Sequence, residues 1–159
     1  METLKLLALD SEDLNVISTH MQDAVICVED MSYLPAENSF VMVARRFNWI
    51  KTQQGKENVR NDKSALERLQ TVLRFQRVLG AQVQNLKFVP QQKALDKALA
   101  LLSITYEPQQ EPEGFITLTF SGEGAVRLHV ECIEAELNDL GAAWAAGSMP
   151  EHKFADEDA

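Results

Sequence analysis

The fold is decided by residues 114–144, which read GFITLTFSGEGAVRLHVECIEAELNDLGAAW. Hydrophobic and polar residues alternate in two runs, Ile116 to Phe120 and Val126 to Val130. A period of two is typical of a half-buried strand. The four residues between the runs, SGEG at 121–124, include glycines that tolerate the positive φ of a tight turn. We therefore predict a β-hairpin here.

A helix-like pattern follows this hairpin almost without a linker. A hydrophobic stripe at helical spacing is formed by Ile133, Leu137, Leu140 and Trp144. Acidic and amide side chains lie between them and would face solvent. We predict a C-terminal helix that ends at Gly141 or runs on to about Gly147. Such a helix would close the open face of a sheet and plug its core.

The rest of the chain contains one more helix pattern and several strand patterns. Asp10 or Ser11 can cap a helix over residues 11–23, because acidic residues follow in its first turn. Strand patterns cover residues 4–9, 24–33, 40–49, 66–86 and 99–107, and Gly80 indicates a bulge or a turn within the fourth. Short links between strands favour antiparallel pairing. We predict an α+β fold, an antiparallel sheet or barrel of about seven strands with an N-terminal helix and a closing C-terminal helix.

Length and composition predict one soluble domain. A chain of 159 residues is typical of a single domain, which we place at residues 1–147, followed by an acidic tail, 148–159, that we expect to fray. Lys51–Ser64 is a polar loop of the kind that is either functional or disordered. No apolar run approaches the ~18 residues of a membrane span, and no signal peptide is evident. We therefore expect a cytoplasmic protein.

Charge and motifs exclude several classes of function. A net charge of -9 disfavours non-specific binding to nucleic acid or anionic lipid. The glycine-rich motifs of nucleotide sites and the nucleophile elbow of hydrolases are missing from the sequence. His129 and Cys132 are close in sequence, but strand alternation separates them, which disfavours a metal site or a nucleophilic pair. We predict no catalytic residue, metal or cofactor, and expect Cys27 and Cys132 to be buried thiols that pack as small hydrophobic side chains.

The middle strands are rich in arginine. Five of these residues are Arg45, Arg46, Arg68, Arg74 and Arg77. Arg45 shares a strand face with Phe47 and Trp49, and Arg74 joins that face if the two strands are neighbours. Arginine beside aromatic rings is suited to a carboxylate, phosphate or peptide ligand. We favour a plainer interpretation, a surface network in which the arginines pair with Glu67, Glu107 and the acidic helices.

Two blocks carry a resemblance to a known family. They are LKLLALDSEDLNVISTHMQDAV at residues 4–25 and LTFSGEGAVRLHVECIEAELNDLGAAWAAGSMPEHK at residues 118–153. They resemble a family of small alphaproteobacterial proteins, domain-of-unknown-function family 2948, which implies a bacterial cytosolic protein and no activity. In topology, the predicted hairpin and helix also resemble the end of a pleckstrin-homology-like barrel. The helix before the first strand departs from that barrel.

These observations leave three functional hypotheses. The first is a non-enzymatic binding or adaptor module that engages a protein or peptide. The second is a small-anion binder or enzyme with an arginine-lined pocket, for which the candidate ligand residues are Arg45, Phe47, Trp49 and Arg74. The third is a homodimer formed through an open sheet edge or the C-terminal helix. We predict the first, with no nucleic-acid partner and no membrane span.

Overall fold

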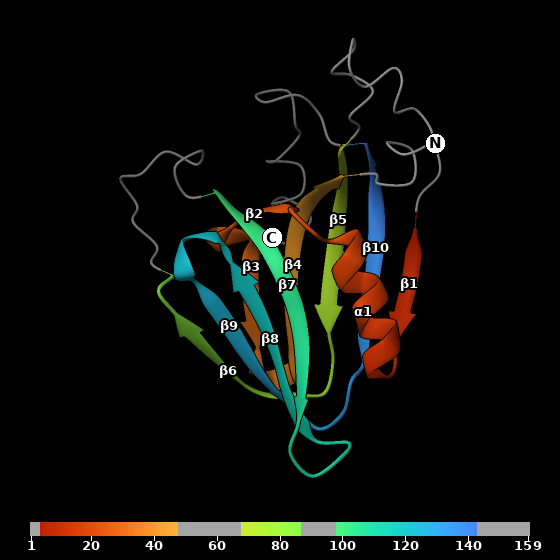
Figure 1. Ribbon diagram of the computed structural model, residues 1–159, viewed down its shortest axis with the longest axis vertical. Helices are drawn as coiled ribbons and strands as arrows, with labels where there is room; N and C mark the ends of the chain where they lie inside the picture. The colour runs from red at the N-terminus through yellow and green to blue at the C-terminus, as the bar shows by residue number, and fades with distance from the viewer. Residues whose placement is uncertain (1–3, 48–67, 87–97, 143–159) are drawn as a thin grey trace.

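A computed structural model describes residues 4–47, 68–86 and 98–142. The predicted tail 148–159, the Lys51–Ser64 loop, Trp49 and Trp144 lie outside these residues. The described part contains ten strands and one α-helix (Figure 1). In chain order they are β1 (Lys5–Ala8), α1 (Ser11–His20), β2 (Val25–Cys27), β3 (Met31–Leu34), β4 (Ser39–Phe47), β5 (Arg68–Phe75), β6 (Val78–Gln84), β7 (Ala98–Pro108), β8 (Gly114–Phe120), β9 (Ala125–Val130) and β10 (Ala135–Ala142).

All strand pairs are antiparallel, as the short links predicted. The strand order is β1-β10-β5-β4-β2-β7-β8-β9-β6, and β3 pairs with β4 beside this path. The sheet curves without closing, so β1 and β6 are its two end strands. The α+β class with an antiparallel sheet is therefore confirmed, with ten described strands where about seven were expected.

The predicted hairpin is present as β8 and β9, with Phe120 N donating to Gly124 O across the turn (2.8 Å). Its inner side chains, such as Leu118 and Leu128, are fully buried. Positive φ occurs at Gly122 (76°) and at Glu123 (66°), and not at Gly124 (-80°). Gly124 has a packing role instead, because a Cβ there would overlap the side chain of Leu86.

The predicted C-terminal helix is wrong, because this segment forms strand β10 between β1 and β5. Ala135 and Leu137 face the core, whereas Leu140 is 51% exposed. Positions 133 and 137 are an even number apart, so they fit a strand as well as a helix. Backbone hydrogen bonds to two neighbouring strands decide between these options. With the closing helix gone, the likeness to a pleckstrin-homology-like barrel loses its main support.

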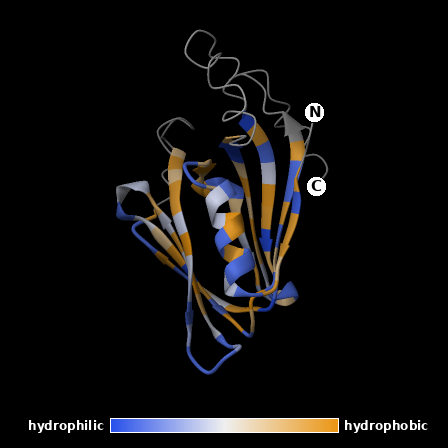
Figure 2. Ribbon diagram, turned by 45° about the vertical axis from the view of Figure 1, so that its right-hand side comes forward, coloured by the Kyte–Doolittle hydropathy of each residue, from blue (hydrophilic) through white to orange (hydrophobic). Residues whose placement is uncertain are grey.

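The helix that covers the core is the N-terminal one, α1. Asp10 caps it by accepting a hydrogen bond from Asp13 N (2.8 Å), which satisfies a free amide of the first turn. Leu14, Ile17 and Met21 are at most 1% exposed. Figure 2 shows the helix lying on the concave side of the sheet. The helix packs against both β1 and β7. Since β1 and β7 belong to different halves of the strand order, α1 bridges the two halves of the curved sheet.

Strands β5 and β6 follow each other but pair in different parts of the sheet. The chain turns at Arg77, whose φ is 60°. At the same corner the chain passes from β9 to β10, and Gln76 N donates to Glu134 O (2.8 Å) while Glu131 N donates to Arg77 O (2.9 Å). The expected irregularity at Gly80 is a shift of register between β6 and β9. At this corner the two strands diverge: β5 pairs with β10 and β4, whereas β6 pairs with β9.

Candidate ligand-binding surface

The residues predicted as a ligand site are only partly brought together. Arg45 and Phe47 alternate with buried Ala44 and Arg46, so they share the outer face of β4. Arg74 also faces outward on β5 and is exposed. However, Arg45 pairs with Gln70 while Arg74 pairs with Val41. Four residues of strand, about 13 Å, separate the two arginines along the sheet.

The arginine on β5 that lies nearest to Arg45 in the register is Arg68, which is diagonal to Arg45 and two residues from its direct partner Gln70. Arg68 is paired with Phe47 across the two strands, and its guanidinium carbon lies 4.1 Å from the centroid of the Phe47 ring. A guanidinium over a ring face is a cation–π contact, which holds the side chain against the sheet. We call Arg45, Phe47 and Arg68 the arginine surface. The sequence pattern does not place Arg68 beside Arg45 and Phe47, because that placement depends on the register between β4 and β5.

The arginine surface carries positive charge without an acidic partner among the described residues. Among the described residues, the ion pairs are formed by Arg46, Arg77 and His129, and none is formed by Arg45 or Arg68. Partial burial lowers the pKa of Arg68, and the charge of Arg45 lowers it further. Two like charges are thus held close together on a chain whose net charge is -9. Such a pair is stabilised when an anion binds between them.

Arg46 points the other way and forms a buried ion pair with Asp139 of β10. Arg46 Nε donates to Asp139 Oδ1 (2.9 Å), Nη2 donates to Oδ2 (2.5 Å), and Nη1 donates to Phe47 O (2.9 Å). The two side chains are 1% and 0% exposed. Leu4 N also donates to Asp139 Oδ2 (2.7 Å). This pair therefore ties β4, β10 and the start of the described chain together.

The titration of this buried pair reflects its hydrogen bonds. Burial alone would raise the pKa of Asp139, but hydrogen bonds from Arg46 and Leu4 outweigh it and lower the pKa below 3.8. His20, at the end of α1, lies close enough to Arg46 and Asp139 for both charges to affect its pKa. Burial lowers the pKa of His20 below 6.5, Arg46 lowers it further, and Asp139 partly opposes both. Because all three guanidinium nitrogens of Arg46 and both carboxylate oxygens of Asp139 form hydrogen bonds inside the protein, we interpret this pair as structural.

A second polar surface lies on the outer face of β8 and β9. His129 Nε2 is 2.5 Å from Glu113 Oε2, and the His129 ring stacks on Phe115 at 5.1 Å between centroids. Arg127 lies over the same ring of Phe115, 3.8 Å from its centroid. This confirms that His129 faces outward. Arg127 is exposed, and the described residues offer it no carboxylate partner.

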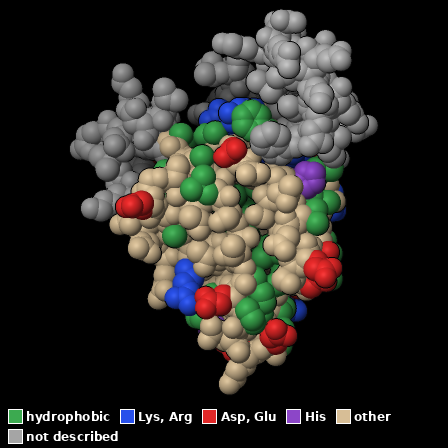
Figure 3. All heavy atoms as spheres, in the orientation of Figure 1, with side chains coloured by type: hydrophobic (Ala, Val, Ile, Leu, Met, Phe, Trp, Pro, Cys, Tyr) green, Lys and Arg blue, Asp and Glu red, His purple; other side chains and the backbone are tan. Residues whose placement is uncertain are grey.

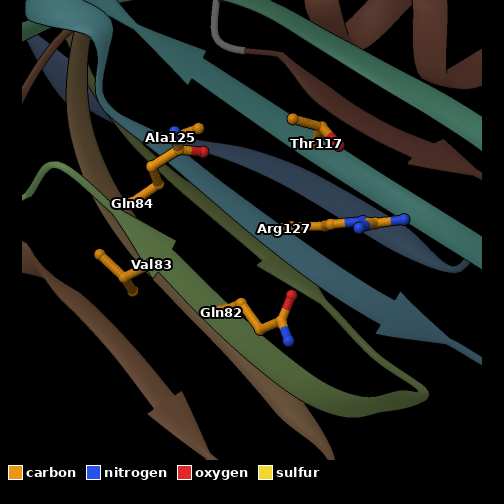
Figure 4. A pocket seen from close by; sticks show the side chains of 6 residues that line it. All are labelled: Gln82, Val83, Gln84, Thr117, Ala125 and Arg127. Carbon is orange, nitrogen blue, oxygen red and sulfur yellow. The ribbon is translucent and has the colours of Figure 1, made fainter.

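A hollow of about 560 Å³ lies beside Arg127, along β6. It is lined by Gln82, Val83, Gln84, Thr117, Ala125 and Arg127 (Figure 4). Val83 belongs to β6 and is 60% exposed although it pairs with buried Val126. We call this hollow the β6 groove. Sequence reasoning missed it, because it depends on which strand ends the sheet.

Three further features bear on the sequence predictions: patches on the surface, groups of metal-binding side chains and membrane-spanning helices. Figure 3 shows basic and hydrophobic side chains side by side at the end of the molecule that borders the grey residues. In the described ranges, no group of three or more His, Cys, Asp or Glu residues is placed to hold a metal ion. Within the same ranges, no helix has the length and apolar composition for crossing a bilayer.

Comparisons with known proteins identify the family and nothing finer. Searches of curated proteins and of solved structures give no match. One family model does match, over residues 4–152, and its description is "Protein of unknown function (DUF2948)". That range includes the hairpin, the helix α1 and all the surfaces described above. The chain therefore belongs to the DUF2948 family of proteins of unknown function.

Proposed function

We propose that this protein is a non-enzymatic binding module that holds an acidic segment of a protein or peptide at the arginine surface. The observation that supports this most is the close placement of Arg45 and Arg68, which have no ion-pair partner among the described residues. Arginine forks bind carboxylates in two-point contacts, and Phe47 adds apolar area beside them. The family resemblance supports a bacterial, cytoplasmic setting.

An extended partner fits this surface better than an enclosed small molecule does. Arg45, Phe47 and Arg68 lie on the outer face of paired strands, whereas the β6 groove is lined by Arg127 and by none of these three. A small ligand gains affinity mainly from enclosure in a pocket. A peptide on an open sheet face can instead gain it from several contacts along its length. The arginine-lined pocket of the alternative hypothesis therefore has less support.

The proposal is tested by titrating the full-length protein with a blocked hexaglutamate peptide, followed by NMR. We expect saturable binding with shifts in β4 and β5, and loss of binding as salt is raised. Arg45→Gln and Arg68→Gln should each weaken binding about tenfold, the effect of losing one charge-assisted hydrogen bond pair. Arg74→Gln is the matched control, since Arg74 is exposed on the same face of β5.

The result separates the two candidate ligands. If Arg74→Gln weakens binding as much as Arg68→Gln does, the arginine surface as defined here is not the site. If inorganic phosphate saturates Arg45 and Arg68 at lower concentration than the peptide does, the small-anion alternative replaces the peptide. If neither probe binds in low salt, the proposal fails.

A further inference from the structure

Strand β6 is an end strand, and its last four residues, 81–84, lack the usual protection against pairing. Its seven residues, VLGAQVQ, include no charged side chain and no proline. Natural proteins usually protect such edges with lysine, proline or a bulge, because free backbone groups pair readily with another strand. The single irregularity in β6 lies between Val78 and Gly80, so Ala81 to Gln84 pair regularly with β9. The outer side of this segment has no strand partner among the described residues.

The opposite end strand, β1, is different. It has four residues and includes Lys5. Both backbone groups of Leu4, just before it, are used by Asp139: Leu4 N donates to the carboxylate and Leu4 O accepts from Asp139 N (3.0 Å). Helix α1 also packs against β1. The two ends of the sheet are therefore not equivalent, and β6 is the longer and uncharged one.

Both faces of the β6 edge present unused contact surface. Val83 touches the rim of the groove, but its register partner Val126 is buried, so the Val83 side chain leaves β6 on the inner face, where it is 60% exposed. On the outer face, the amides of Gln82 and Gln84 and the guanidinium of Arg127 line the groove (Figure 4). Side chains of an added strand would alternate between these two faces. One set would cover Val83, and the other would enter the groove beside Arg127.

We propose that β6 binds an extended peptide segment of a partner protein as an additional strand. The segment alternates apolar residues, which pack beside Val83, with acidic residues, which face Arg127 and the two glutamines. Backbone hydrogen bonds to β6 provide affinity, and the alternating side chains provide specificity. A second copy of this chain fits less well, because β6 has no acidic residue to offer Arg127. This site is separate from the arginine surface.

The probe for this site is a blocked nonapeptide that alternates valine and glutamate, mixed with the full-length protein. We expect saturable binding and slower hydrogen exchange at the amides of β6. Val83→Lys, which places a charge on the edge, should weaken binding at least about tenfold. Leu7→Lys is the matched control, because Leu7 is on the opposite end strand and is 58% exposed. Arg127→Glu should weaken binding to a similar degree by reversing the charge in the groove.

A second set of probes needs no change to the protein. A peptide with lysine in place of glutamate tests the charge, and a peptide with N-methyl groups on alternate amides tests the backbone pairing. Both should bind at least about tenfold more weakly. Arg45→Gln with Arg68→Gln should leave the peptide-induced slowing of hydrogen exchange at the β6 amides unchanged, so failure here and failure of the proposed function are distinguishable.

Three results would overturn the proposal. One is equal affinity for the N-methylated and unmodified peptides. Another is a Leu7→Lys variant that loses binding while Val83→Lys retains it. The third is sedimentation showing a dimer that Val83→Lys converts to a monomer, because β6 would then pair with a second copy.

Discussion

The buried pair of Arg46 and Asp139 allows a prediction whose size follows from its geometry. Asp139→Asn keeps the shape of the side chain and one acceptor for Leu4 N, but it removes the negative charge. The guanidinium of Arg46, which is 1% exposed, then remains buried without a counter-charge. We therefore expect the substitution to destabilise the fold far more than its conservative chemistry indicates.

The expected cost is about 3–5 kcal/mol, the usual penalty for removing one partner of a buried ion pair. Domains are commonly stable by about 5–15 kcal/mol, so this is a large fraction of the total. For a domain of this size the midpoint of thermal unfolding should fall by roughly 10 °C. An exposed pair should cost about 1 kcal/mol or less. Arg77→Gln supplies that control, because Arg77 and Glu134 are 3.6 Å apart with side chains 58% and 37% exposed.

The assay is urea unfolding of the wild type, Asp139→Asn, Arg46→Met and the double variant Arg46→Met/Asp139→Leu. Replacing both partners with apolar side chains leaves no isolated charge, and such exchanges are often nearly neutral. The double variant should therefore lose less stability than the two single variants together. Some cost will remain, because Leu4 N loses its acceptor. The reasoning would be refuted if the double variant lost as much stability as the two single variants summed. It would also be refuted if either single variant lost less than about 1 kcal/mol.

Acid provides an independent check on the same pair. The pKa of Asp139 is lowered in the folded protein, so its contribution to stability is present above 3.8 and is lost as pH falls through the folded pKa. Asp139→Asn has no such titration. The difference in unfolding free energy between the wild type and Asp139→Asn should therefore become smaller in strong acid. A difference that does not change with pH would show that the substitution destabilises the fold through packing and not through the lost charge.

Further predictions concern other parts of the fold. His20 has a lowered pKa, so the folded protein binds fewer protons than the unfolded chain, and stability should fall as pH drops below 6.5; His20→Gln should flatten that part of a thermal-unfolding series. Leu137→Ala should cost about 2–5 kcal/mol and Leu140→Ala less than about 0.5 kcal/mol, because the strand buries only the first. A helix would make the two losses similar. Gly114→Ala should cost about 1–3 kcal/mol, because a Cβ there would lie 2.5 Å from the backbone oxygen of Glu107, and an unchanged melting temperature would contradict this close packing.

Local patterns sufficed where neighbours in sequence are also neighbours in space. The hairpin of β8 and β9 forms between adjacent runs that share a short turn, so alternation and turn residues specify it. Helix α1 begins at the capping residue Asp10, and its buried stripe appears in the spacing of Leu14 and Ile17. The antiparallel sheet likewise followed from short links between strands. The hairpin and helix α1 thus depend on contacts between residues that are close in sequence.

The sequence alone determined the hairpin, helix α1, the sheet class and the outward face of Arg45 and Phe47. Only the tertiary structure decided that β10 is a strand, that Asp139 is buried against Arg46, and that Arg68 rather than Arg74 lies beside Arg45. Each of these outcomes depends on register between segments dozens of residues apart. A one-residue shift in register moves a side chain to the other face, and an i, i+4 spacing cannot tell helix from strand. Long-range backbone pairing supplies that missing information.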